Sequence, residues 1–344
     1  MAKKPIDIEL SEQSALLSES YGVSSKKPDH FNVETIDEAL SIIKEADGLA
    51  KVVGGGTDLI RMLKNKVIEP KILINLKKIR ELKYIRETDD GLFIGALTTL
   101  KEVISSPIIR KKYPIIVEAA YTVASPQIRN MGTVAGNLCQ EVQCWYYRRS
   151  PILGKSFHCW RKGGKICFAI KGESVYHGIL GCNKCFASLP SDLAPALAAL
   201  DSMVEIISLN GEKSIDIASL YTPLGITLTQ DEIITSIYVP LPKPSTRQRF
   251  LKFRDRKTID FAISSVATVL STANGSVSNA RVVLGGVSPV PYRATEAEDI
   301  LTGQKITENL ANQAAKAAVS KAKPLKDNAY KIAITEALVK RALL

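Results

Sequence analysis

All six cysteines of this 344-residue chain lie between Cys139 and Cys185. The surrounding segment, residues 139–186, is rich in aromatic, basic and glycine residues and has no sustained hydrophobic period, so it is predicted to be a long loop. Loops of this length are usually functional. Clustered cysteines outside oxidising compartments are more often metal ligands or redox groups than disulfides. The segment therefore indicates a metal or cluster site, with thiols that are free or packed in an apolar core as the alternative.

The remaining composition is that of a globular protein without a membrane span. Apolar residues make up 45% of the chain and charged residues 24%, and no apolar run approaches the roughly 20 residues that a bilayer requires. The start, MAKKPIDIEL, lacks the apolar stretch of a secretory signal, so we expect a cytoplasmic protein. The net charge of +11 is spread along the sequence. It indicates a basic surface, or a face that docks acidic proteins, rather than a nucleic-acid-binding protein.

Hydrophobic patterning divides the chain into three regions. Residues 1–26 are polar and are expected to form an N-terminal arm or tail. Residues 27–242 alternate between apolar strands, glycine turns and helices, and the cysteine-rich segment interrupts them. The strand pattern EIITSIYVPLPKP ends in prolines, and we place a domain boundary there. Residues 243–344 are expected to form a separate α+β domain that ends in two alanine-rich helices.

Local signals predict several elements of the first large region. Thr35 and Glu38 have the spacing of a helix N-terminal cap, and the apolar run KILINL predicts a buried strand. The Asp-Asp-Gly sequence at 89–91 is typical of a β-hairpin turn. Residues 100–125 are expected to be helical and to be broken at their two internal prolines.

Two glycine-containing loops follow apolar stretches. The first consists of Gly54, Gly55, Gly56, Thr57 and Asp58, between the strand pattern AKVV and a helical pattern. Glycines let the backbone approach a ligand closely, and free N–H groups at a helix start suit a phosphate. The spacing matches neither the dinucleotide fingerprint nor the Walker motif, so a tight structural turn is the alternative.

The second loop spans residues 130–137, and its Gly132 and Gly136 flank small residues. It offers a similar bare-backbone surface to a flat or anionic ligand. Two such loops, each beside an apolar strand, favour one extended ligand such as a dinucleotide.

A family resemblance follows from the order of four motifs: VVGGGTDL, IGALTTL, RNMGTVAGNL and SDLAPALAAL. In this order they resemble the flavin-binding medium subunits of molybdenum hydroxylases, the carbon monoxide dehydrogenase and xanthine dehydrogenase family. The stretches ARVVLGGVSPVPYRATEAEDIL and KDNAYKIAITEALVKRALL resemble that family's C-terminal domain. The resemblance implies an α+β fold: a two-lobed FAD-binding domain of the p-cresol methylhydroxylase type over 27–242, then a C-terminal α+β domain over 243–344. The lobes would span about 27–80 and 81–242.

The resemblance also implies that FAD lies between the two lobes. The residues that would bind it are Gly54, Gly55, Gly56, Thr57, Asp58, Ala96, Thr98, Gly132, Thr133, Gly136, Asn137 and Asp192. The two glycine loops would hold the diphosphate, and Asp192 would hydrogen-bond the ribityl or ribose hydroxyls. Asp192 could instead cap a helix, and Thr98 could be an ordinary strand residue. Lys252 and Lys257 are further candidates for flavin contacts.

The cysteine-rich segment is unusual for this family, in which the GTVAGNL loop mostly runs almost directly into the SDLAPAL helix. Here about fifty residues intervene. An iron–sulfur cluster needs several converging thiolates, and zinc takes the same ligands in a tetrahedron. The only C-x2-C pair is Cys182 and Cys185, and the other spacings are irregular. This pattern favours a loop around a cluster over a zinc ribbon.

The insertion resembles that of the 4-hydroxybenzoyl-CoA reductase β subunit, a branch of the family with an extra 4Fe–4S cluster. The resemblance matches four cysteines to the cluster ligands: Cys144, Cys159, Cys167 and Cys185. Cys182 is the alternative fourth ligand, and Cys139 would pack near the flavin loop. His158 and His177 could also bind the metal, although loop histidines more often make surface or hydrogen-bonding contacts.

These cofactors imply an oxidoreductase subunit that has no substrate-converting residues of its own. FAD exchanges electrons in pairs or singly and could therefore couple a two-electron partner to iron–sulfur clusters. We expect a molybdopterin-binding large subunit, a small subunit with two 2Fe–2S clusters, and an external carrier such as a ferredoxin. The alternatives are a subunit that passes electrons outward to NAD with the cluster as an accessory, and a zinc-stabilised scaffold without redox function.

Overall fold

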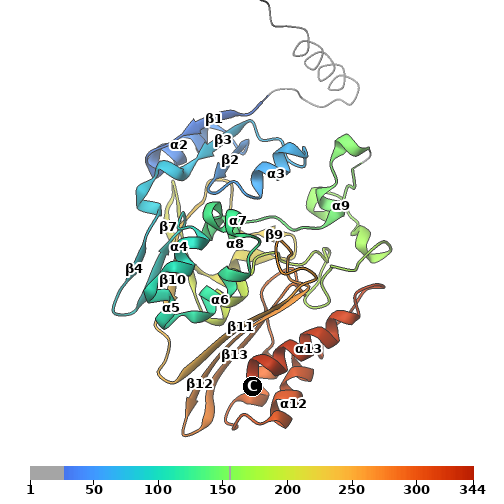
Figure 1. The fold of residues 1–344 in the computed structure, drawn as a ribbon. Coiled ribbons are helices and arrows are strands. Elements are labelled where there is room, and N and C mark those ends of the chain that lie inside the picture. The colour runs from blue at the N-terminus through green and yellow to red at the C-terminus, as the bar shows by residue number, and fades with distance from the viewer. Residues whose placement is uncertain (1–26, 155) are drawn as a thin grey trace, which may run out of the picture.

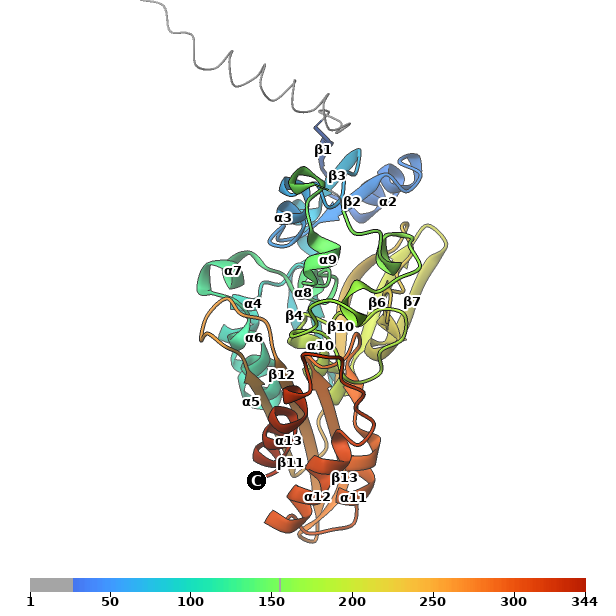
Figure 2. The same cartoon turned by 90° about the vertical axis from the view of Figure 1, so that its right-hand side faces the viewer.

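The computed structural model describes residues 27–154 and 156–344, so the expected N-terminal arm lies outside the described residues. Three sheets follow one another along the long axis of the molecule, from the first lobe at the top to the C-terminal domain at the bottom (Figures 1 and 2). In the described part of the chain, no helix is both long and apolar enough to cross a bilayer.

The first lobe is built on a three-stranded parallel sheet. Its strands, in sheet order, are β1 (Asp29–Asn32), β3 (Ile72–Asn75) and β2 (Ala50–Val53). Parallel neighbours need crossover connections, and the helices α2 (Ile36–Glu45) and α3 (Leu59–Lys64) supply them. The predicted cap is confirmed: the Thr35 side chain accepts a hydrogen bond from the Glu38 N–H. The apolar face of α2 then packs on the sheet through Ala39, Leu40 and Ile43.

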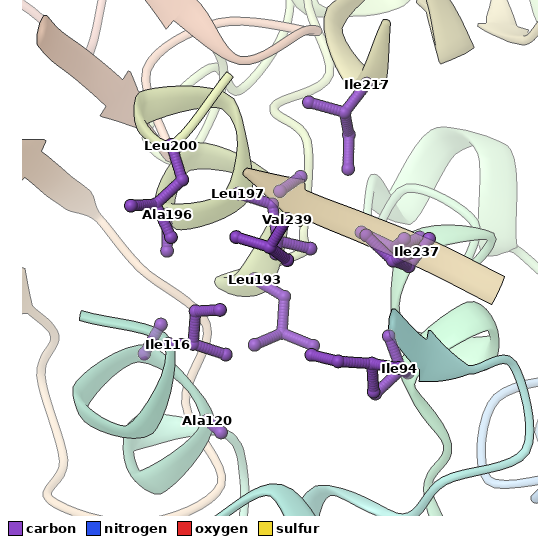
Figure 3. Packing of buried hydrophobic residues seen from close by; sticks show 14 of the residues in the cluster. Ile94, Ile116, Ala120, Leu193, Ala196, Leu197, Leu200, Ile217, Ile237 and Val239 are labelled. Atoms are coloured by element: carbon purple, nitrogen blue, oxygen red, sulfur yellow. The ribbon is translucent and has the colours of Figure 1, made fainter. Parts of the chain in front are cut away.

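The second lobe is built on a five-stranded antiparallel sheet. Its strands, in sheet order, are β4 (Ile85–Glu87), β5 (Gly91–Gly95), β10 (Ile233–Pro240), β6 (Met203–Ser208) and β7 (Gly211–Asp216). The predicted hairpin at 89–91 joins β4 to β5. Figure 3 shows Ile94 and Ile237 of this sheet facing Leu193 of α10 (Leu193–Ala199) and Ile116 of α6 (Pro114–Thr122).

The helical stretch of the second lobe is divided at its prolines, as predicted. Its three helices are α4 (Leu100–Ser105), α5 (Pro107–Lys112) and α6. Pro107 and Pro114 are the first residues of α5 and α6, where a missing N–H costs nothing because that group has no intrahelical partner. Two short helices follow, α7 (Pro126–Met131) and α8 (Val134–Leu138), and α8 carries the second glycine loop.

The C-terminal domain is a four-stranded antiparallel sheet with helices on both faces. Its strands, in sheet order, are β11 (Thr246–Phe253), β12 (Ser264–Ala273), β13 (Ser276–Gly285) and β14 (Tyr292–Arg293). The helices of its own core are α11 (Thr295–Leu301), α12 (Glu308–Ala318) and α13 (Tyr330–Leu343). The opposite face contacts α6 and α10 of the second lobe. At this contact Gly285 lies so close to Pro195 that an added Cβ would be 2.7 Å from the proline ring.

The cysteine-rich segment is mostly irregular, which confirms the predicted long loop. It contains the four-residue helix α9 (Trp145–Arg148) and isolated 3-10 turns. The small hairpin of β8 (Tyr221–Thr222) and β9 (Gly225–Ile226) lies against it. The segment reaches from α3 of the first lobe to the beginning of α13 (Figure 1). It therefore contacts all three folded units.

Candidate functional site

The two glycine loops lie directly against each other, although about 75 residues separate them in the sequence. A Cβ on Gly55 would lie 2.1 Å from the carbonyl oxygen of Met131 and 3.0 Å from the Cα of Gly132. A Cβ on Gly54 would lie 3.0 Å from Oγ1 of Thr133. The backbones of the two lobes are therefore in direct contact. At position 55 only glycine leaves room for this contact, because it has no Cβ.

The first loop presents unused backbone donors. Within the described residues, the N–H groups of Gly55, Gly56, Thr57 and Asp58 donate no hydrogen bond. Gly56 has φ +72°, a conformation that side chains disfavour, and it turns the loop. Successive free N–H groups in such a turn form a concavity that binds anions.

The second loop uses its backbone donors to stay in place. Val134 donates to the carbonyl of Thr98 at 2.9 Å, and Ala135 donates to the carbonyl of Ala96 at 3.1 Å. The Thr98 side chain is buried and donates to the carbonyl of Tyr84. Ala96 and Thr98 therefore hold the second loop against the sheet, and this loop forms a wall rather than a second set of free donors.

A cavity of about 130 Å³ lies where the loops meet. The predicted residues that line it are Thr57, Asp58, Gly132, Thr133, Gly136, Asn137 and Asp192. Lys252 also lines it, whereas Lys257 is exposed and lies outside the lining. One side is closed by residues 259–261, where Ile259 has the unfavourable φ of 71° for a β-branched residue. The structure thus brings seven of the twelve predicted cofactor residues to one cavity, with Ala96 and Thr98 behind its wall.

Asp192 forms a buried ion pair with Lys252. The carboxylate and Lys252 Nζ are 2.6 Å apart, and the two side chains are only 5% and 2% exposed. Asp192 precedes α10 but caps none of its N–H groups, so the alternative capping role is not observed. The pair places two polar groups, each satisfied by the other, on the wall of the cavity.

Asp58 joins the glycine loop to the cysteine-rich segment. Its carboxylate accepts hydrogen bonds from the Glu141 N–H at 3.0 Å and from the Arg148 guanidinium at 2.8 Å. It caps no N–H group of α3. The position of the loop is therefore coupled to the position of the insertion.

Four of the six cysteines line one small cavity inside the insertion. They are Cys144, Cys159, Cys167 and Cys185. Cys182 is not part of this lining, and its Sγ lies 3.4 Å from the carbonyl of Leu180. Cys139 packs against the core of the second lobe. In residues 27–154 and 156–344, no three Cys, His, Asp or Glu side chains are gathered tightly enough to hold a single metal ion.

Hydrogen-bonding groups lie close to two of the four thiols, Cys185 and Cys144. Arg161 Nε lies 3.3 Å from the Sγ of Cys185, and the Ala187 N–H lies 3.5 Å from the same sulfur. His177 Nε2 lies 3.4 Å from the Sγ of Cys144. His177 is buried and His158 is exposed, and neither lines the cavity.

Burial is the largest influence on the pKa of two of the thiols, Cys144 and Cys167. It raises the pKa of Cys144 to about 12, although the N–H groups of Tyr147 and Tyr146 act in the opposite direction. Burial likewise raises the pKa of Cys167, against the N–H groups of Phe186 and Ala169. A metal centre would have to displace these protons, because thiolates are the ligating form.

Family models match both parts of the chain. The model described as the FAD binding domain in molybdopterin dehydrogenase matches residues 26–242. The CO dehydrogenase flavoprotein C-terminal domain matches residues 249–344.

The chain belongs to the FAD-binding subunits of this molybdopterin dehydrogenase family.

Known proteins are similar to this chain over nearly its whole length. The chain is 32% identical, over 88% of its length and 93% of the relative, to the FAD-binding subunit of an aldehyde oxidoreductase of Escherichia coli (strain K12). It is 28% identical to the carbon monoxide dehydrogenase medium chain of Hydrogenophaga pseudoflava, over 90% of its length and 93% of that chain. The solved structure of that organism's carbon monoxide dehydrogenase, which lacks the Mo-pyranopterin moiety of the cofactor, superimposes with a TM-score of 0.74. The identity is 26% there, over 92% of this chain and 96% of the other.

The family assignment confirms the expected fold and cofactor. The α+β fold is a FAD-binding domain followed by a CO dehydrogenase flavoprotein C-terminal domain. This FAD-binding subunit is a medium subunit of the molybdenum hydroxylase family and an oxidoreductase component, and its flavin is FAD. Its own residues fit that cofactor, because four successive free N–H groups suit a diphosphate. Thr57 and Asp58 of this set line the cavity that the other motifs also line, whereas Gly54, Gly55 and Gly56 lie outside its lining.

Some residues of this site were not predicted from the sequence of the FAD-binding subunit. Glu141, Arg148 and Arg161 tie the insertion to the glycine loop and to Cys185. For Arg148 and Arg161 the one sequence signal was the basic character of the segment, which is equally typical of a solvated surface, and Glu141 had no signal. Which partner each would meet depends on how the loop folds back, and no spacing rule gives that.

Proposed function

We propose that this chain is the electron-transfer subunit of a molybdenum hydroxylase or reductase complex, with FAD between its lobes and a 4Fe–4S cluster in segment 139–186. It would relay electrons between an external carrier, the cluster, FAD and the 2Fe–2S clusters of a partner subunit. One observation carries the proposal: the four cysteines matched to the reductase β subunit line a single cavity. The division into a FAD-binding domain at 27–242 and a C-terminal domain at 243–344 is part of the same proposal.

In the cavity of about 130 Å³ where the glycine loops meet, here called the flavin cleft, several of the predicted groups have a proposed task. The free N–H groups of Gly55 to Asp58 bind the diphosphate, as their anion-binding geometry supports. Thr133 and Gly136 form the opposite wall, and Asp192 hydrogen-bonds a sugar or ribityl hydroxyl while it remains paired with Lys252. When bound, FAD supplies chemistry that joins two-electron and one-electron partners. The protein orients it and excludes water.

In the insertion, Cys144, Cys159, Cys167 and Cys185 are the proposed cluster ligands. Cys185 is favoured over Cys182 because Cys185 lines the cavity with the other three thiols. Arg161 and the N–H groups near the sulfurs suit an anionic centre, since hydrogen bonds to sulfur stabilise thiolate clusters. Tyr146, Tyr147, Trp160 and Phe168 provide a partly dry shell.

The two proposed cofactor sites adjoin through a second cavity of about 440 Å³. Cys144 and His177 line it on the insertion side. Pro190, Asp260 and Phe261 line both this cavity and the flavin cleft. These shared lining residues support a direct relay between the two cofactors.

The surface of the insertion supports docking of an acidic one-electron carrier. Segment 139–186 contains eight Lys or Arg residues and two Glu residues, so it contributes +6 of the net charge of +11. A groove of about 570 Å³ beside it is lined by Arg61, Arg149 and Leu153, and Leu153 is 71% exposed. Tyr146 lines both this groove and the cysteine cavity. We therefore propose a ferredoxin-like partner here.

The substrate reaction belongs to other chains in this proposal. A molybdopterin-binding large subunit converts the substrate, and a small 2Fe–2S subunit connects it to the flavin. The word "medium" in the names of the carbon monoxide dehydrogenase relatives supports a complex of several chains.

Metal and flavin analysis of the anaerobically purified protein tests the proposal. We expect about four irons and one FAD per chain. Cys144→Ser, Cys159→Ser, Cys167→Ser and Cys185→Ser should each lower iron content and keep FAD. Cys182→Ser and Cys139→Ser are the matched controls and should keep both. Zinc in place of iron would reject the cluster, and iron loss in Cys182→Ser but not in Cys185→Ser would reverse the ligand choice.

The external carrier is tested by rate measurements. Stopped-flow reduction with reduced ferredoxin should be fast and should slow as ionic strength rises, because salt screens charge steering. The double change Arg61→Glu and Arg149→Glu should slow it further, with Lys340→Glu in the last turn of α13 as control. Faster reduction by NADH, without salt dependence, would favour exchange with NAD instead.

A further inference from the structure

Arg161 is a nearly buried cation at the edge of the cysteine cavity. Its side chain is 6% exposed. Its Nε points at the Sγ of Cys185 at 3.3 Å, and one terminal nitrogen donates to the carbonyl of Pro223 at 3.1 Å. The other terminal nitrogen lies 3.5 Å from a carboxylate oxygen of Glu141. The guanidinium is therefore held by three groups, only one of which carries a compensating charge.

Glu141 balances this cation only in part. Its side chain is 40% exposed, so water screens its charge more strongly than that of Arg161. Its own N–H donates to Asp58 of the glycine loop at 3.0 Å, which fixes its backbone. The pair thus presents a net positive potential, with a hydrogen-bond donor, to one side of the cavity.

We propose that Arg161 and Glu141 are positioning residues that set the reduction potential of the 4Fe–4S cluster in opposite directions. This inference rests on the proposed function, since it requires the cluster. Uptake of one electron from an external reductant adds one negative charge to the cluster and its thiolates. The step neither forms nor breaks a bond, and Arg161 keeps its proton. A nearby cation that donates to sulfur stabilises the reduced state, and a nearby carboxylate destabilises it.

The other donors near the cavity have different characters. His177 approaches Cys144 on another side of the cavity. Lys162 has its Nζ 5.7 Å from the centre of the Tyr147 ring, so its ammonium is directed at an aromatic face. Among the described residues, Arg161 combines a cationic N–H···S contact with burial, and this combination selects it.

An EPR-monitored redox titration of the anaerobically purified protein tests the inference with three variants. Arg161→Gln should shift the cluster potential by about 59 mV to more negative values. For a one-electron step this corresponds to about a tenfold lower ratio of reduced to oxidised cluster at a given solution potential. Glu141→Gln should shift it in the positive direction by a smaller amount. Arg161→Lys keeps the positive charge but loses the rigid, planar N–H donors of the guanidinium. The cluster potential of this variant should therefore lie between those of wild type and Arg161→Gln.

The opposite signs separate this role from a structural one. Suppose that Arg161→Gln and Glu141→Gln both keep wild-type iron and FAD contents. Unchanged potentials in both variants, or shifts of the same sign, would then overturn the inference. If Arg161→Gln loses iron, Glu141→Gln decides: a positive shift supports the inference, and no shift or a negative shift overturns it. A wild-type protein without iron would instead refute the proposed function itself, which the iron count reveals before any titration.

Discussion

The Asp192–Lys252 pair shows how one residue contact can serve both stability and binding. Both charges are almost fully buried, and each is the other's main partner at 2.6 Å. Removing one partner of a buried pair leaves an uncompensated charge, which costs far more than the pair itself contributes. The pair therefore fixes the relation between α10 and β11, and with it one wall of the flavin cleft.

Asp192→Asn should destabilise the protein by about 3–5 kcal/mol, because Lys252 would lose its buried counter-charge. Denaturant unfolding measures the effect. Asp201→Asn is the matched control, since Asp201 is 53% exposed and pairs with Arg281 at the surface. Its loss should cost less than about 1 kcal/mol. Equal losses in the two variants would contradict the buried role of Asp192.

Gly55→Ala tests the contact between the two glycine loops. The new Cβ would lie 2.1 Å from the Met131 carbonyl oxygen, so the loops would have to separate. We expect most of the bound FAD to be lost, measured as flavin absorbance per chain after gel filtration. Gly275→Ala is the control: it strains a hairpin glycine at φ +77° far from the cleft and should keep FAD. Full FAD content in Gly55→Ala would show that the loops can move apart freely.

For single residues, the sequence predicted those contacts that are made between near neighbours in the chain. The Thr35 cap involves a partner three residues away, and the glycine loops follow apolar strands, so both were visible. The partner of Asp192 is 60 residues away on another domain, and the partners of Asp58 are 83 and 90 residues away. Such pairings depend on the assembled fold. For this reason the sequence could not show that the Asp58 carboxylate, expected at the flavin, holds the insertion.

Among the elements, α13 has a role beyond closing the C-terminal core. Its first turns and the preceding residues hold the segment 174–178 of the insertion through hydrogen bonds. The N–H and hydroxyl of Ser174 donate to the Asp327 carboxylate, and the Asp327 N–H donates back to the Ser174 hydroxyl. The side chains of three further residues donate to carbonyls of the segment: Asn328 to those of His177 and Gly178, Tyr330 to that of Val175, and Lys331 to that of Tyr176. We call these contacts the α13 clasp. The repetitive alanine pattern of the helix predicted the helix but gave no sign of the clasp.

Lys331 should make stability depend on pH. It is fully buried, and burial lowers its pKa to about 7, although the Cys182 thiol acts in the opposite direction. His177 is the other titratable group that faces it. Between pH 7 and about 10 the unfolded chain binds a proton that the folded chain does not, so the free energy of unfolding rises with pH. For Lys331 alone, the gain from pH 7 to pH 9 should be about 2 kcal/mol. The buried thiols of Cys144 and Cys182, whose pKa values are raised by burial, act with the opposite sign above about pH 8 and reduce the net gain.

Denaturant unfolding at these two pH values checks the prediction. Lys331→Met should remove the gain, whereas Lys340→Met, at a partly exposed lysine on the same helix, should retain it. The same pH dependence in wild type and Lys331→Met would assign the effect to another group.

At the scale of the whole molecule, the insertion contacts both lobes and the C-terminal domain and so links all three. Asp58 holds it to the first lobe, Tyr221 of β8 donates to the carbonyl of Leu138 just before it, and the α13 clasp holds it to the C-terminal domain. The layered α+β architecture was predictable because its strands and helices are periodic. The path of the insertion was not, because it follows a few long-range hydrogen bonds within an aperiodic stretch.

Asn328→Ala tests the clasp. Asn328 is fully buried, donates to the carbonyls of His177 and Gly178, and accepts from the Leu325 N–H at 2.7 Å. Leaving these groups without partners should cost about 1–3 kcal/mol and loosen segment 174–178. Hydrogen exchange measured by mass spectrometry should be faster in this segment and unchanged in the glycine loops, with FAD retained. Unchanged exchange in the segment would mean that the remaining clasp residues suffice.

The α13 clasp also imposes an order on biosynthesis. Ser174 and Asp327 are 153 residues apart, so the ribosome makes the first well before the second. At roughly 5–20 residues per second, the growing chain carries its cysteines without this anchor for on the order of 10–30 s. During that interval the thiols are accessible to whatever delivers iron and sulfide, and equally to oxidants. Translation speed therefore sets a time window for cofactor maturation, and slower codons between these two positions would lengthen it.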